Sequence, residues 1–174
     1  MRPMSQSRLT LMRHGAAEYI LSADGDFERS LTPAGVRDVT AMARWYHARN
    51  CRPDLILASP AKRTRSTADI LCHQFGMALD HLHLVPEIYD ASMETLLTII
   101  RAADARITHL FLVGHNPSLY ELSRFCLGHS NGPRDFAPGG IIEMLFECAW
   151  GDVGADTGTR VCARSPADQD EVHD

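Results

Sequence analysis

Three short apolar runs along the chain have the length of buried β-strands. They cover residues 9–12, 55–58 and 109–113, and runs this continuous are typical of strands covered on both faces. Between and after them, apolar residues recur at helical spacing in four segments, which follow Thr32, Ser59, Ser92 and Asn116. The alternation of strands and helices predicts an α/β fold with a mostly parallel central sheet.

The predicted helices share a pattern at their starts. Thr32 is a good N-cap, and a proline follows it at the first helical position, where the missing N–H costs nothing. Ser59 and Asn116 are also followed by proline, so we expect both to begin helices in this way, and Gly76 to end the second one. The residues expected on the buried faces are Val36, Val39, Ala43, Tyr46, Ala68, Leu71, Phe75, Leu96, Ile100, Ala103, Leu119, Leu122 and Cys126.

The remaining segments are predicted to be an edge strand, loops and a short antiparallel pair. Residues 81–85 alternate polar and apolar like an edge strand, and residues 16–30, 86–90 and 128–140 have the composition of loops. Residues 141–146 predict a strand, with residues 159–163 as its antiparallel partner. Residues 165–174 are acidic with little to bury, so we expect a flexible tail. No linker interrupts the chain, which predicts a single domain over residues 1–174.

Composition excludes several classes of function. A formal net charge of −5 and a pI near 6.0 over 174 residues predict no nucleic-acid partner. The N-terminus lacks the apolar core of a secretory signal and no apolar run could span a bilayer, so we expect a cytoplasmic protein with no membrane partner. Five scattered cysteines indicate reduced thiols. His81 and His83 could form a metal pair, but no third ligand has matching spacing.

The residues with candidate chemistry follow the predicted strands. Arg13 and His14 come directly after residues 9–12, Arg63 lies at the start of the helix after residues 55–58, and His115 follows residues 109–113. The carboxyl ends of such strands converge in one crevice. Two arginines and two histidines there would bind a phosphate dianion, and one histidine could attack phosphorus. We expect His14 to form a phosphohistidine that water hydrolyses, with no metal or cofactor, and Gly15 to let the backbone turn close to the bound group.

Four motifs that contain these residues occur in one order along the chain. They are Arg13-His14-Gly15, Leu31-Thr32-Pro33-Ala34-Gly35, Ser59-Pro60-Ala61-Lys62-Arg63 and Val113-Gly114-His115-Asn116-Pro117. Together they resemble the histidine phosphatase superfamily, in particular its short phosphohistidine phosphatase branch. The resemblance implies a three-layer α/β/α fold of the phosphoglycerate mutase-like type. It also implies that His14 is the phosphorylated nucleophile and that Arg13, Arg63 and His115 form the phosphate pocket.

The family commonly places a glutamate after the third strand as general acid, and Glu87 is the best positional match. Asp90 and Glu18 are further candidates. An acid is dispensable for a phosphohistidine substrate, because its leaving group is already labile. Ile20 stands where the mutases of this superfamily have an asparagine, and the chain is too short for their inserts. A mutase is therefore disfavoured, and an open pocket is favoured.

We therefore predict a metal-independent phosphatase whose substrate is a phosphohistidine protein or a small phosphate monoester. Two alternatives stay open from the sequence. One is a catalytically idle module that binds a phosphorylated partner, and the other is a phosphotransferase that passes the phosphoryl group to an acceptor other than water. The oligomeric state is not predicted.

Overall fold

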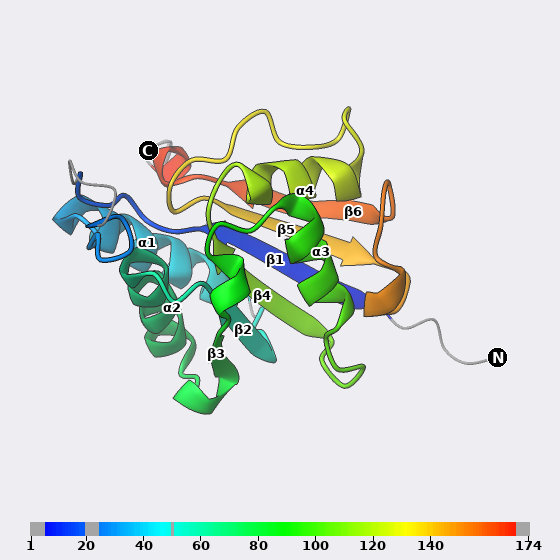
Figure 1. The fold of residues 1–174 in the computed structure, drawn as a ribbon, viewed down its shortest axis with the longest axis horizontal. Helices are drawn as coiled ribbons and strands as arrows, with labels where there is room; N and C mark the ends of the chain where they lie inside the picture. The colour runs from blue at the N-terminus through cyan, green and yellow to red at the C-terminus, as the bar shows by residue number, and fades with distance from the viewer. Residues whose placement is uncertain (1–5, 20–24, 50, 170–174) are drawn as a thin grey trace.

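The centre of the fold is a six-stranded mixed sheet (Figure 1). The computed structural model describes residues 6–19, 25–49 and 51–169. The strands run in the order β3-β2-β4-β1-β5-β6. Their bounds are β1 (Ser7–Arg13), β2 (Leu55–Ala58), β3 (Leu82–Leu84), β4 (His109–Gly114), β5 (Ile141–Phe146) and β6 (Gly158–Arg164). The strands β1 to β4 are parallel to one another, β5 runs antiparallel to β1, and β6 runs antiparallel to β5. This confirms the predicted mostly parallel sheet and the predicted pairing of its last two strands.

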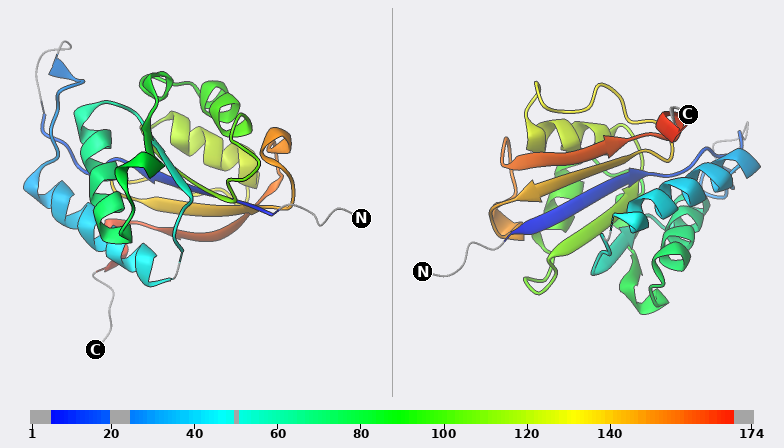
Figure 2. Two further views of the ribbon diagram at one scale, coloured as in Figure 1. Left: turned by 90° about the horizontal axis from the view of Figure 1, so that it is seen from below. Right: turned by 180° about the vertical axis from the view of Figure 1, so that it is seen from behind.

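Four helices cover the two faces of this sheet. In Figure 1, α3 (Met93–Arg101) and α4 (Ser118–Leu127) lie in front of the strands. The view from behind in Figure 2 shows α1 (Pro33–Ala48) and α2 (Lys62–Phe75) on the opposite face. The three-layer α/β/α architecture is therefore confirmed. The described residues also form four short 3-10 helices, η2 (Leu79–His81), η3 (Pro86–Ile88), η4 (Trp150–Asp152) and η5 (Pro166–Gln169).

The strand β1 divides its side chains between the two layers because successive residues point to opposite faces. Leu9 and Leu11 are fully buried on the side of α3 and α4, whereas Met12 is buried on the side of α1 and α2. β4 pairs with β1 in register and alternates in the same way. Full burial of one such side chain stabilises the fold by about 1.5–3 kcal/mol. The hydrophobic cores on the two faces of the sheet thus hold β1 in place, and the carboxyl end of β1 carries Arg13.

Several predicted helix ends are confirmed. Thr32 caps α1 through its side chain, which accepts from the backbone N–H of Gly35, and proline occupies the first turn. Ser92 caps α3 by accepting from the N–H of Thr95. Gly76 ends α2 in the left-handed region with φ of 60°, which a residue with a Cβ rarely adopts. These local signals work because each satisfies a backbone group that the helix leaves free.

Other predicted boundaries are wrong. Ser59 accepts from the N–H of Ala61, but α2 begins only at Lys62, because the chain turns at residues 59–61 before it coils. Asn116 does not cap α4, whose N-cap is Pro117, because its amide donates to the carbonyl of Phe136 instead. Val36 is 42% exposed, since the buried stripe of α1 runs through its neighbours Gly35 and Val39.

Two predicted irregular segments contain more structure than expected. Residues 86–88 form η3 where we expected a loop. Residues 166–169 form η5 where we expected a flexible tail, and the carboxylate of Asp168 accepts from the N–H and the hydroxyl of Ser165 there. The remainder of that segment, residues 170–174, and residues 20–24 of the loop at 16–30 lie outside the described residues.

Candidate active site

The structure brings Arg13, His14, Arg63 and His115 together at the carboxyl ends of three neighbouring strands. Arg13 is the last residue of β1, His115 directly follows β4, and Arg63 is the second residue of α2, which follows β2. All four line a cavity of about 420 Å³, which we call the strand-tip cavity. Its other lining residues are Arg29, Asp90, Ala91, Asn116, Pro117 and Ser118, so the first turn of α4 also borders it.

The hydrogen bonds of His14 define which ring nitrogen carries its proton. Nδ1 lies 2.7 Å from the carbonyl oxygen of Gly15, which can only accept, so Nδ1 is protonated. Nε2 is therefore unprotonated, and its lone pair accepts a hydrogen bond from Arg63 Nε over 3.3 Å. Burial lowers the pKa of His14 to about 4 against the effect of the Gly15 carbonyl, and the charges of Arg63, Arg13 and Arg29 add to the lowering. His14 is neutral at pH 7, with a nucleophilic Nε2 beside Arg63.

His115 has the opposite tautomer. Arg63 Nη2 lies 3.4 Å from its Nδ1, and because a guanidinium only donates, Nδ1 accepts and Nε2 carries the proton. The pKa of His115 is lowered to about 3, mainly by burial and then by the charges of His14 and Arg63. The rings of His14 and His115 meet edge to face with centroids 5.3 Å apart. His115 Nε2–H is buried without a hydrogen-bond partner among the described residues, so it is free to donate to a bound group.

Asp26 holds Arg63 in this orientation. Arg63 Nη1 donates to the backbone carbonyl of Asp26 over 2.6 Å, and Nη2 donates to Asp26 Oδ2 over 3.0 Å. These contacts occupy one edge of the guanidinium and leave the Nε side toward the two histidines. The Arg63 side chain is only 6% exposed, so its charge depends on these partners.

The Asp26 carboxylate binds two further side chains of the site. Oδ1 accepts from Arg29 Nη1 at 3.1 Å, and Oδ2 accepts from the hydroxyl of Tyr89 at 2.9 Å. Burial raises the pKa of Asp26, but the hydrogen bonds from Arg29 and Tyr89 and the charge of Arg63 outweigh it and lower the pKa to about 2. Asp26 is therefore ionised at neutral pH and positions three side chains at once.

Arg13 is fixed from the loop that precedes β5. Its Nη1 and the amide of Asn116 both donate to the carbonyl of Phe136, each over 3.0 Å. Arg13 Nε is buried and, within the described ranges, has no partner. Buried polar groups are nearly always hydrogen-bonded. Two unpartnered donors at one cavity, Arg13 Nε and His115 Nε2, therefore suit an anion that accepts from both.

Two glycines place the backbone of His14 against α1. A Cβ on Gly15 would lie 2.6 Å from a methyl group of Val39, and one on Gly35 would lie 2.2 Å from the carbonyl oxygen of Ala16. We expected Gly15 to allow approach to a bound group. The structure shows that it allows approach to α1, and this packing holds the adjacent His14.

With this geometry established, comparisons with known proteins identify the family. The model of the histidine phosphatase superfamily (branch 1) matches residues 9–112. The chain belongs to the histidine phosphatase superfamily. This confirms the resemblance to the superfamily, and the match includes the first three of the four motifs.

Solved structures of this superfamily share the fold of the whole chain. The structure of a candidate phosphohistidine phosphatase SixA from Agrobacterium tumefaciens is 28% identical, with a TM-score of 0.78 over 92% of this chain and 98% of that one. Another candidate SixA, from Nakamurella multipartitia, is 27% identical with a TM-score of 0.77 over 94% and 98%. An uncharacterised Mycobacterium tuberculosis protein is 31% identical over 114 residues, which are 64% of this chain and 67% of that protein. The similarity to the two SixA structures places this chain in the SixA-like branch of the superfamily.

The structure separates the candidate acids of this histidine phosphatase. Glu87 is exposed on η3 and is not among the residues that line the strand-tip cavity. Glu18 is also exposed outside the cavity, where its carbonyl accepts from Arg29 Nε. Asp90 does line the cavity, and its backbone has a φ of 56°, in the left-handed region that aspartate tolerates better than most residues.

Sequence reasoning missed Asp26, Arg29 and Tyr89. Asp26 and Arg29 lie in a segment with the composition of a solvated loop, and no periodicity indicates that their side chains turn inward. Their spacing of three residues, directly before the Leu31-Thr32 motif, was the one available signal.

The described residues contain neither a metal-binding cluster nor a membrane-spanning helix. Among residues 6–19, 25–49 and 51–169, no three His, Cys, Asp or Glu residues form a group that could hold a metal ion. His81, one of the possible metal pair, has its Nδ1 3.0 Å from the carbonyl oxygen of Asp54. The helices in these ranges are all too short or too polar to cross a membrane.

Proposed function

We propose that this phosphatase acts without a metal, through a phosphohistidine intermediate on His14, and that its substrate is a phosphohistidine in another protein. The observation that carries the proposal is the neutral His14, whose unprotonated Nε2 lies 3.3 Å from Arg63 in a cavity lined by three arginines. The positive charge that a metal often supplies in phosphoryl transfer comes here from guanidinium groups.

In the first step, His14 Nε2 attacks phosphorus and the bond from phosphorus to the leaving group breaks. As the Nε2 lone pair bonds to phosphorus, Arg63 Nε–H would shift its hydrogen bond from Nε2 to an equatorial oxygen of the loose transition state. Arg13 and His115 Nε2–H would hold the other equatorial oxygens. Asp26 assists indirectly, because it fixes Arg63 before the substrate arrives and so lowers the cost of orienting it.

The leaving group needs a proton, and Asp90 is the carboxyl group best placed to supply it. It lines the cavity, whereas Glu87 does not. An imidazole leaving group needs this help less than an alkoxide does, because it leaves readily from phosphorus. Within the described part of the chain, the cavity is lined by one carboxyl group, that of Asp90. We therefore expect the site to suit a phosphohistidine substrate, which needs little acid catalysis, better than an alkyl phosphate.

In the second step, water attacks the phosphorus of phosphorylated His14, the bond from Nε2 to phosphorus breaks, and inorganic phosphate leaves. Nε2 regains its lone pair, while Nδ1 keeps its proton through the carbonyl of Gly15. The names of the two SixA structures support a phosphohistidine substrate for this chain as well.

The test measures phosphate release, in the presence of a chelator, from a phosphohistidine-bearing phosphotransfer protein and from p-nitrophenyl phosphate. We expect His14→Ala to lose activity by at least about 10³-fold. His73→Ala, an exposed histidine on α2, is the matched control and should stay active. Labelled phosphate should be trapped on the wild-type chain but not on His14→Ala.

Each other outcome has a clear meaning. Full activity of His14→Ala would refute the mechanism, and inhibition by the chelator would refute metal independence. Label that passes to an acceptor other than water would identify a phosphotransferase, and binding of phosphate without release from either substrate would identify an idle module. An Asp90→Asn variant should slow release from the aryl ester more than release from phosphohistidine.

A further inference from the structure

Two hollows continue from the strand-tip cavity along the surface. The first, of about 340 Å³, shares Arg13 and Asn116 with the strand-tip cavity. The second, of about 320 Å³, shares residues 134–137 with the first and extends to Arg160 and Arg164 on β6. We call the two hollows together the flanking groove. Residues 134–137 line both parts, so the two hollows adjoin at this loop, one on the side of the proposed phosphate site and the other on the side of the edge strand β6.

The loop that lines the flanking groove is fixed to the active site. Phe136 is 5% exposed, and its carbonyl accepts from Arg13 and Asn116, which line the strand-tip cavity. The N–H of Gly139 lies 3.0 Å from the carbonyl oxygens of both Arg13 and His14. A molecule that occupies the groove would therefore have a defined position relative to His14.

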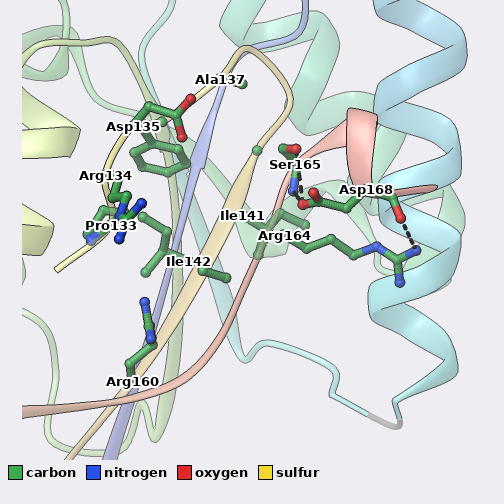
Figure 3. Close-up of a pocket in the computed structure, with 13 residues that line it drawn as sticks. Pro133, Arg134, Asp135, Ala137, Ile141, Ile142, Arg160, Arg164, Ser165 and Asp168 are labelled. Atoms are coloured by element: carbon green, nitrogen blue, oxygen red, sulfur yellow. Dashed lines mark hydrogen bonds between the residues drawn. The ribbon is translucent and has the colours of Figure 1, made fainter. Parts of the chain in front are cut away.

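The outer hollow carries two arginines without an ion-pair partner in the described part of the chain. Arg134 and Arg160 are exposed and both line this hollow, and in the view of Figure 3 their side chains extend toward each other. The carboxylate of Asp135 points away from both in the same view. The hollow is thus positively charged at this point, on a chain with a formal net charge of −5.

The other charged residues of the outer hollow are bound locally. The carboxylate of Asp168 accepts from the N–H and the hydroxyl of Ser165. Arg164 donates to the carbonyl of Asp168 over 3.3 Å, and its guanidinium lies 4.8 Å from the ring centroid of Trp45. Among the described residues, Arg134 and Arg160 are therefore the cations of the outer hollow whose side chains have no ion-pair or hydrogen-bond partner.

We propose that Arg134 and Arg160 bind an acidic side chain of the phosphohistidine-bearing protein, beside the phosphorylated residue. The inference rests on the proposed function, because it names a second contact of the same substrate. A small phosphate ester fits within the strand-tip cavity and does not reach across residues 134–137. A protein segment does, and its carboxylates complement the two free guanidinium groups. The groove thus favours acidic phosphohistidine segments over neutral ones.

The test compares two synthetic phosphohistidine peptides, one flanked on both sides by glutamates and the other by glutamines, with p-nitrophenyl phosphate as the small substrate. We expect wild type to show a kcat/KM about tenfold higher on the glutamate peptide, and increasing salt to reduce this preference. Arg134→Glu with Arg160→Glu should abolish or reverse the preference and leave kcat/KM on p-nitrophenyl phosphate within about twofold of wild type. The milder Arg134→Gln with Arg160→Gln should abolish it without reversal.

The matched control reverses two charges elsewhere, with Arg37→Glu and Arg44→Glu on the exposed face of α1. It should keep the wild-type preference. A wild type that hydrolyses both peptides equally would overturn this inference and leave the proposed function intact. An equal loss on all three substrates in both groove variants would also overturn it, as would a control that loses the preference. Hydrolysis of p-nitrophenyl phosphate but of neither peptide would instead refute the phosphohistidine substrate, and with it the acidic partner.

Discussion

Replacing Asp26 by alanine should loosen the active site and destabilise the fold together. The substitution removes the acceptor of three side chains, Arg63, Arg29 and Tyr89, and leaves the 6% exposed Arg63 with only the backbone carbonyl on that edge. Hydrogen bonds to charged groups contribute about 1.5–3 kcal/mol each, but the Asp26 side chain is 37% exposed, so solvent replaces part of the loss. We expect a loss of about 2 kcal/mol in the free energy of unfolding, which corresponds to a melting temperature lower by about 4–8 °C.

The same substitution should also slow catalysis. Arg63 would no longer be held toward the histidines, and misplacement of a catalytic group by about 1 Å can cost about 100-fold. We therefore expect kcat/KM on a phosphohistidine protein to fall by about 10- to 100-fold, measured at a temperature well below the melting transition. Asp26→Asn keeps one side-chain acceptor and should recover part of the loss.

The pH dependence of the stability loss has a defined sign. The pKa of Asp26 is lowered to about 2 in the folded protein, against an ordinary value of 3.8. Its ionised form therefore stabilises the fold above about pH 4, and this contribution disappears as the pH falls toward 2. The difference in melting temperature between wild type and Asp26→Ala should shrink over the same range.

Asp104→Ala is the matched control, because it removes an aspartate that pairs with an arginine at 2.7 Å on the exposed surface. It should change neither the melting temperature nor kcat/KM appreciably, since exposed ion pairs contribute little. If Asp26→Ala melts at the wild-type temperature and keeps the wild-type kcat/KM, the argument that Asp26 positions Arg63 is wrong. If it loses stability but no activity, Asp26 has a structural role alone.

Two further predictions concern stability. Gly35→Ala should lose about 1–3 kcal/mol in a urea titration, because its Cβ would lie 2.2 Å from a backbone oxygen, whereas Gly151→Ala, with nothing within 4 Å, should change little. Acidification from pH 6.5 to 4 should destabilise the fold, because the unfolded chain takes up protons at histidines that the folded chain keeps neutral, and His109 alone, with its pKa lowered by burial to about 4, contributes about 3 kcal/mol. His109→Gln should reduce this pH slope, and an unchanged slope would contradict the assignment.

The sequence predicted the sheet and the four residues at its strand ends because each depends on strong local signals. Continuous apolar runs form buried strands whatever their partners, and the parallel order then brings Arg13, His14 and His115 to one edge. Thr32 and Gly76 define helix ends because each satisfies free backbone groups within its own turn.

Two of the wrong predictions, for Asn116 and Val36, concern contacts between segments that are distant in the chain. Asn116 has the sequence signature of an N-cap, but its amide donates to the carbonyl of Phe136, 20 residues away. Val36 fits the helical period, but the packing of Gly35 against Ala16 turns the buried stripe of α1 away from it. A local pattern predicts what one segment can do alone, and tertiary contacts then select among its options.

The residues of the proposed chemistry and the residues of the surrounding loops differ in the same way, in how far a local pattern predicts them. The proposed nucleophile His14 and the proposed phosphate-binding residues Arg13, Arg63 and His115 are carried by strand ends and the adjoining helix starts. The hydrophobic cores on the two faces of the sheet determine the positions of these elements. Asp26, Arg29 and Arg134 come from loops, where no periodic pattern reports the direction of a side chain. Members of the superfamily can therefore keep one reaction while their loops change, and differences in substrate among them should map to segments equivalent to residues 25–31 and 128–140 of this chain, with the strand ends unchanged.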